Sequence, residues 1–109
     1  MLETLLGSVS CEQVLLFILA REEGYPREIA RFFSVDYSPI RNQLDKLEAA
    51  GILRSRSAGR TRLYSFSPRC PFTAELKGLL AKVMTFCPAE LKEELLMNRR
   101  RPRRRGKPV

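Results

Sequence analysis

Apolar residues recur along the chain with helical spacing, and the segment from residue 36 to residue 50 shows this most simply. Asp36 is suited to the N-cap position, because its carboxylate can accept hydrogen bonds from first-turn amides. Gly51 is suited to the position just after the helix end. The large apolar side chains lie four and three residues apart, on one face of the predicted helix: Ile40, Leu44 and Leu47. The opposite face is polar, so we expect a helix held on one side and open to a partner on the other.

Two more helices are predicted before this one. Ser10 and Gln13 have the spacing of a capping box, so Ser10 is expected to cap a helix over residues 11–23. This helix has more apolar surface than one stripe, which is typical of a central helix or of one shared with a second subunit. A proline opens a short helix over residues 26–33, and about three residues separate it from the helix at 36–50. Two helices joined by so short a turn predict a helix-turn-helix.

From Ile52 onward, apolar and polar residues alternate with a period of two, the pattern of a β-strand. The two alternating runs flank Ala58-Gly59-Arg60, where Gly59 can adopt the positive φ of a tight turn. A hairpin that directly follows a helix-turn-helix is a wing. Its arginines are expected along the hairpin or at its tip: Arg54, Arg56, Arg60 and Arg62.

Helical spacing returns after the hairpin and predicts helices over residues 73–86, with Thr73 at the cap, and over residues 89–98. The fold class is therefore mainly α with a small β-hairpin. Apolar positions at both ends of the chain exceed what a core of this size needs, so we expect a two-fold dimer through the terminal helices. The residues predicted at this interface are Leu15, Ile18, Leu79, Val83, Leu91 and Leu95.

Positive charge is concentrated in two segments of this chain of 109 residues, whose formal net charge is +8. Residues 51–72 contain five arginines and no acidic residue, and residues 99–109 carry a charge of +7. Localised positive charge of this kind indicates a polyanionic partner. We divide the chain into a folded domain over residues 1–98 and a basic tail over residues 99–109, whose composition predicts disorder. The tail can add sequence-independent affinity for DNA, bind RNA, or serve as a solubilising end.

Histidine is absent from the sequence, which removes the commonest general base and the commonest metal ligand. Neither a glycine-rich phosphate loop nor a hydrolase nucleophile motif is present, so we expect no enzyme and no cofactor. The three cysteines, Cys11, Cys70 and Cys87, are widely spaced, and we interpret them as buried or unreactive thiols. No apolar run is long enough to span a membrane and no signal peptide is apparent, which predicts a cytoplasmic protein.

The polar face of the helix at 36–50 carries side chains that can hydrogen-bond to base edges and phosphates in a major groove. These candidate contacts are Tyr37, Ser38, Arg41, Asn42 and Lys46. The wing arginines are suited to phosphates or to the minor groove. An ordinary solvated helix flank and surface hairpin are the alternatives, but five arginines without one acid are unusual for such a surface.

The run VDYSPIRNQLDKLEAAGIL, followed by RSRSAGRTRLYSFSP, resembles the winged helix-turn-helix of ArsR-like and MarR-like transcription regulators. A narrower resemblance, over about residues 1–82, is to the winged-helix family often encoded with minimal nucleotidyltransferases; LLGSVSCEQVLLFIL, YPREIARFF and PFTAEL carry it. The resemblance implies DNA binding by the second helix and the wing, and dimerisation by the terminal helices. The paired cysteines or histidine-rich ligands of ArsR metal sensors are absent, so no metal site is expected.

Three functions follow as hypotheses. The first is a homodimeric, sequence-specific regulator of transcription, a repressor that binds double-stranded DNA at an inverted repeat. The second is a protein-interaction module that docks onto a separately encoded partner such as a nucleotidyltransferase. The third is an RNA-binding adaptor that acts through the arginine-rich tail.

Overall fold

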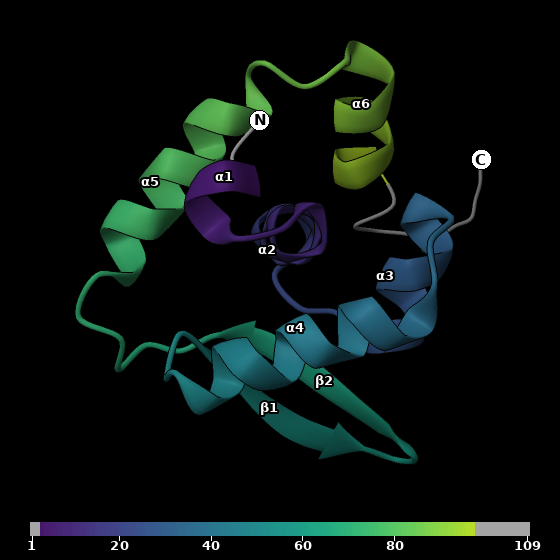
Figure 1. The fold of residues 1–109 in the computed structure, drawn as a ribbon, viewed down its shortest axis with the longest axis vertical. Helices are drawn as coiled ribbons and strands as arrows, with labels where there is room; N and C mark the ends of the chain where they lie inside the picture. The colour runs from purple at the N-terminus through teal and green to yellow at the C-terminus, as the bar shows by residue number, and fades with distance from the viewer. Residues whose placement is uncertain (1–2, 98–109) are drawn as a thin grey trace.

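The computed structural model describes residues 3–97, which form six helices and one β-hairpin. Figure 1 shows their arrangement. None of the helices in this range is long and apolar enough to cross a membrane. The predicted fold class, mainly α with a two-stranded antiparallel hairpin, is confirmed. The elements are α1 (Glu3–Leu6), α2 (Val9–Arg21), α3 (Pro26–Phe33), α4 (Tyr37–Ala49), β1 (Leu53–Ala58), β2 (Thr61–Phe66), α5 (Thr73–Met84) and α6 (Ala89–Met97). Asn98 and the predicted basic tail at 99–109 lie outside the described residues.

Helix α2 is the central element of the fold. Figure 1 views it end-on, with α1 and α5 on its left, α6 above and to the right, α3 on its right, and α4 and the hairpin below. It packs on all four of the longer helices and on β2, which explains why its apolar surface exceeds one stripe. The side chains of Val14, Phe17 and Ile18 are fully buried.

The start of α2 differs from the prediction. Ser8, rather than Ser10, is the N-cap: its hydroxyl accepts a hydrogen bond from the Cys11 amide at 3.1 Å. Ser10 lies within the helix, so the predicted capping box with Gln13 is wrong. The preceding turn at Gly7, where φ is +94°, brings the chain out of α1 and places Ser8 at the cap.

The helix-turn-helix is confirmed. Helices α3 and α4 are separated by three residues, of which Ser34 has a left-handed conformation with φ of 57°. Asp36 occupies the N-cap position of α4 as predicted, although its side chain makes no capping hydrogen bond. Gly51, with φ of +84°, follows the C-cap as expected and lets the chain turn into β1.

The hairpin pairs β1 with β2 in an antiparallel register that sets Ser55 opposite Tyr64 and Arg56 opposite Leu63. The middle of β2 is joined to the body by a bridge that the sequence did not reveal. Gly24, between α2 and α3, donates to the Tyr64 carbonyl at 3.0 Å and accepts from the Tyr64 amide at 2.8 Å. A Cβ at Gly24 would lie 2.7 Å from the ring of Phe17, so this close approach needs glycine.

The helices after the hairpin begin at the predicted residues, but α5 differs in its N-cap and in its end. Phe72, rather than Thr73, is the N-cap of α5, and the hydroxyl of Thr73 donates to the Ser67 carbonyl at 2.9 Å. Helix α5 ends at Met84 and its C-cap is Thr85, short of the predicted end at Phe86.

Four of the six residues predicted at a dimer interface lie in the core of the chain itself. Helices α5 and α6 pack on α2 and cover its apolar sides, so these side chains are buried within the chain itself. These four are Leu15, Ile18, Val83 and Leu95. Leu79 is 40% exposed and Leu91 is partly buried, so these two remain near the surface.

Arg21, at the end of α2, ties α6 to the helix-turn-helix. Its guanidinium lies 4.6 Å from the ring centre of Phe17 and 4.9 Å from that of Phe32. It donates to the carbonyls of Glu94 at 3.1 Å and of Leu95 at 3.2 Å, in the last turns of α6. An ion pair with Glu28 of α3 at 3.9 Å completes the set, so one side chain contacts α2, α3 and α6.

Candidate nucleic-acid interface

Helix α4 divides into a buried and an exposed side as predicted. Ile40 and Leu44 are fully buried and Leu47 is nearly so, all against the core. Because these positions anchor the helix, the side chains between them point outward. Of the predicted contacts, Ser38, Arg41, Asn42 and Lys46 are exposed and Tyr37 is half-buried.

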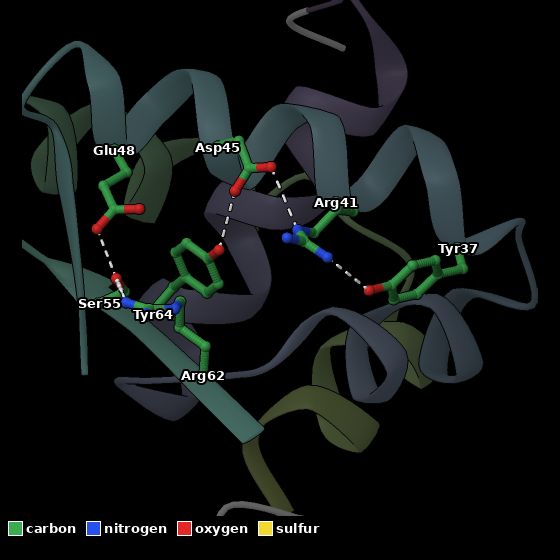
Figure 2. A network of polar contacts seen from close by, with 7 residues as sticks. All are labelled: Tyr37, Arg41, Asp45, Glu48, Ser55, Arg62 and Tyr64. Carbon is green, nitrogen blue, oxygen red and sulfur yellow. Dashed lines mark hydrogen bonds and ion pairs between the residues drawn. The ribbon is translucent and has the colours of Figure 1, made fainter. Parts of the chain in front are cut away.

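A chain of polar contacts joins the exposed side of α4 to the hairpin, as Figure 2 shows. The hydroxyl of Tyr64 on β2 donates to one carboxylate oxygen of Asp45 at 3.0 Å. The other oxygen accepts from the Nε of Arg41 at 3.2 Å, one helical turn earlier. Arg41 in turn donates to the hydroxyl of Tyr37 at 3.0 Å. Asp45 therefore couples the hairpin to the helix and orients Arg41.

Burial and the neighbouring Asp45 raise the pKa of Tyr64 to about 12. The phenol therefore stays protonated at physiological pH and donates its hydrogen bond to Asp45. The hydrogen bond to Tyr37, with the nearby charge of Asp45, raises the pKa of Arg41. The guanidinium keeps its charge and retains donors that no described residue uses.

The wing arginines, Arg54, Arg56, Arg60 and Arg62, do not share one face. The register places Arg54 and Arg56 on the outer face of the hairpin and Arg62 on the face that carries Tyr64, whereas Arg60 lies in the turn. Arg56 is paired with Glu23 at 2.8 Å, which partly neutralises its charge. Arg62 donates to the Ser55 hydroxyl at 2.8 Å, and Ser55 donates to Glu48 of α4 (Figure 2).

Sequence reasoning missed Arg27, which lies in the first turn of α3. Its guanidinium lies 4.8 Å from the ring centre of Tyr37, beside the start of α4. A signal was present: with Pro26 at the first helical position, Arg27 puts a cation in a first turn, where the helix dipole disfavours it. A basic residue at such a position indicates a role other than helix stability.

Arg27, Arg41, Arg60 and Arg62 surround one cavity. It has a volume of about 320 Å³ and lies between the first turns of α3 and α4 and the tip of the hairpin. Three tyrosines, Tyr25, Tyr37 and Tyr64, complete most of the wall. The structure thus brings together the start of the predicted recognition helix and two of the four wing arginines. Ser38, Asn42 and Lys46 of α4 and Arg54 and Arg56 of β1 are not part of this cavity.

The three cysteines are free thiols, as interpreted from the sequence. Cys11 and Cys70 are buried and Cys87 is partly buried. Burial raises the pKa of Cys11 and of Cys87, which keeps both in the less reactive thiol form.

No protein-family profile matches the sequence, and a search of curated proteins found no match either. Solved structures are similar in fold. A mutant of MarR from E. coli is 21% identical with a TM-score of 0.60, over 89% of this chain and 69% of that one. The transcriptional regulator BldR from Sulfolobus solfataricus is 21% identical with a TM-score of 0.57, over 89% and 67%. An apo-form mutant of ZitR from Lactococcus lactis is 19% identical with a TM-score of 0.54, over 83% and 76%. These likenesses concern the fold, and with the helix-turn-helix and hairpin described above they show that this chain is a winged helix-turn-helix protein.

Proposed function

We propose that this protein is a homodimeric transcription regulator of the cytoplasm that binds double-stranded DNA sequence-specifically and acts as a repressor. The main support is that α4 has one buried and one exposed side. Ile40 and Leu44 are fully buried, while Arg41 and Asn42 on the opposite side are exposed. A helix anchored in this way can enter a major groove with its polar side free to contact base edges. The similar fold of BldR, a transcriptional regulator, agrees with this function.

The terminal helices supply the surface for dimerisation. Large apolar side chains are exposed on or beside α1, α2, α5 and α6, at Leu5, Val9, Leu79, Phe86 and Leu96. Apolar side chains gathered on the terminal elements favour pairing with a second copy by a two-fold axis. Two α4 helices related in this way would enter successive major grooves, so the operator should be an inverted repeat with half-sites about 10 bp apart.

Selection of duplexes from a random pool, at physiological salt, tests the proposal. Arg41 is suited to a bidentate contact with guanine and Asn42 to one with adenine, each worth about 1–3 kcal/mol of discrimination. We expect Arg41→Ala to lose the preference at one base position of each half-site and Asn42→Ala at another. Both variants should retain most of their affinity for random duplex, because phosphate contacts remain.

Lys82→Ala is the matched control, since Lys82 is an exposed cation on α5 and its loss removes the same charge from another side of the protein. It should leave the selected sequence unchanged. An unaltered base preference in Arg41→Ala and Asn42→Ala would contradict the reading role of α4. Absence of salt-dependent duplex binding in the wild type would instead favour the protein-docking module. Loss of all preference on deletion of residues 99–109 would favour the tail-driven adaptor.

A further inference from the structure

The cavity between α3, α4 and the hairpin tip contains an unusual balance of charge. Its wall includes Arg27, Arg41, Arg60 and Arg62 and, among the described residues, no aspartate or glutamate. Among these four, Arg41 pairs with Asp45 at 3.2 Å. Within residues 3–97, no carboxylate forms an ion pair with the other three. Three positive charges therefore border a cavity of about 320 Å³ without a neutralising group in it.

Two of these arginines are held in place by neutral partners. Arg62 donates one hydrogen bond, at 2.8 Å, to the hydroxyl of Ser55. Arg27 lies over the ring of Tyr37 at 4.8 Å. Such contacts orient a guanidinium without neutralising it, and each group keeps donors for a ligand. By contrast, Arg56 on the other face of the hairpin is already paired with Glu23. The cavity is thus built to receive an anion with several oxygen acceptors.

The position of the cavity indicates which anion. Figure 1 shows the hairpin running beneath α4, with its tip toward the end at which α4 begins. When α4 occupies a major groove and the wing reaches the adjacent minor groove, one DNA strand must pass between them. The cavity lies on that path. Phosphodiester oxygens match the paired donors of guanidinium groups, which bind phosphate in a bidentate manner.

We propose that this cavity, the phosphate seat, holds one phosphodiester of the DNA backbone, with Arg27 and Arg62 as its two main ligands. The proposal rests on the proposed function and adds to it a residue of α3 that the helix-turn-helix pattern alone does not assign. Arg41, already oriented by Asp45 and Tyr37, remains available to the bases. The seat fixes how far α4 enters the groove but reads no base.

Salt dependence of binding tests the seat, because each phosphate neutralised contributes about 0.9 to the slope of log K against log salt. Duplexes obtained by the selection above and scrambled duplexes are titrated with wild type, Arg27→Ala, Arg62→Ala and the double variant. We expect each single variant to bind both duplexes about tenfold more weakly. Its slope should fall by less than one, because the other arginine still contacts the same phosphate, whereas the double variant should lose about one.

Several outcomes would overturn the seat. A loss of about two in the double variant would mean two separate phosphates, and an unchanged slope would mean no contact. Weaker binding to the selected duplex alone would assign a base contact. Lys82→Ala controls for the loss of one charge, and thermal unfolding verifies that each variant is folded. If the double variant behaves as wild type while wild type still selects a sequence, the seat fails and the regulator proposal stands. If wild type shows no salt-dependent duplex binding, both fail.

A second experiment distinguishes the DNA backbone from a free anion as the ligand of the cavity. Ethylation of one backbone phosphate in each half-site should weaken wild-type binding and leave the already weaker double variant unaffected. Inorganic phosphate alone is then titrated against the protein. Displacement of DNA by micromolar phosphate, lost in the double variant, would make the cavity a site for a free anion and overturn the proposal. Interference by ethylation without such displacement supports it.

Discussion

Replacing Tyr64 by phenylalanine removes one hydroxyl from the contact between the hairpin and α4. The ring is 1% exposed and stays packed, so the change isolates the hydrogen bond to Asp45 at 3.0 Å. Hydrogen bonds to charged groups contribute about 1.5–3 kcal/mol to stability, and Asp45 is half-exposed, which favours the low end. We therefore expect Tyr64→Phe to lower the free energy of unfolding by about 1.5 kcal/mol. For a domain of this size, the melting temperature should fall by about 6–12 °C.

The raised pKa of Tyr64 gives the same interaction a pH signature. Its pKa is about 12 in the folded protein and 10 for an ordinary tyrosine. This difference limits the pH-dependent contribution of Tyr64 to stability to about 2.7 kcal/mol. Because the folded pKa is the higher one, this stability is fully present below pH 10 and is lost as pH rises toward 12. Phenylalanine does not ionise. The difference between wild type and Tyr64→Phe should therefore shrink between pH 10 and pH 12.

Urea unfolding at pH 7 and between pH 10 and pH 12 measures both effects. Tyr37→Phe is the control, since its hydroxyl accepts one exposed hydrogen bond from Arg41 and its loss should cost less than about 0.5 kcal/mol. Equal midpoints for wild type and Tyr64→Phe at pH 7 would refute a stabilising hydrogen bond. A difference that stays constant up to pH 12 would refute the ionisation argument.

Three other substitutions test features of the fold by urea unfolding. Gly24→Ala should lower the free energy of unfolding by about 1–3 kcal/mol, because the new methyl group overlaps a fully buried phenylalanine ring. Gly78→Ala, in the open middle of α5, should instead raise it by about 0.5–1 kcal/mol. Similar values for both variants would contradict this argument. Ser8→Ala should lower the free energy of unfolding by about 1 kcal/mol, because it removes the N-cap of α2, whereas Ser10→Ala should change it little. The reverse order would instead support Ser10 as the cap. Arg21→Met should lower the free energy of unfolding by about 1–3 kcal/mol, because two carbonyls of α6 lose this donor. An unchanged urea midpoint would show that these carbonyls find other partners.

The parts of the fold that were predictable depend on local spacing. The apolar face of α4 follows from three positions in one helix, Ile40, Leu44 and Leu47, and all three are buried. The turn at Gly59 follows from one residue that tolerates positive φ, and φ there is +66°. Such signals act within a few residues and do not need the tertiary structure.

The parts that were missed depend on contacts between distant segments. Ser8 and Ser10 both suit a cap, and the choice depends on where the turn at Gly7 leaves the chain. The apolar excess on α2 fits a central helix or one shared with a second subunit, because its sequence does not reveal that α5 and α6 of the same chain cover it. Of the candidate interface, exposure of the α4 side chains was predictable. The convergence of Arg27 and Arg62 on one cavity was not, because it joins α3 to β2.

The bridge between Gly24 and Tyr64 has a consequence for variation of the wing. Both hydrogen bonds are made by main-chain atoms of Gly24 and of Tyr64, which pairs with Ser55 in the middle of the hairpin. No side chain of the tip takes part in them. The angle at which the hairpin leaves the body is therefore insensitive to its length. Residues inserted at or removed from the turn should extend or shorten the reach of the wing while α4 keeps its place.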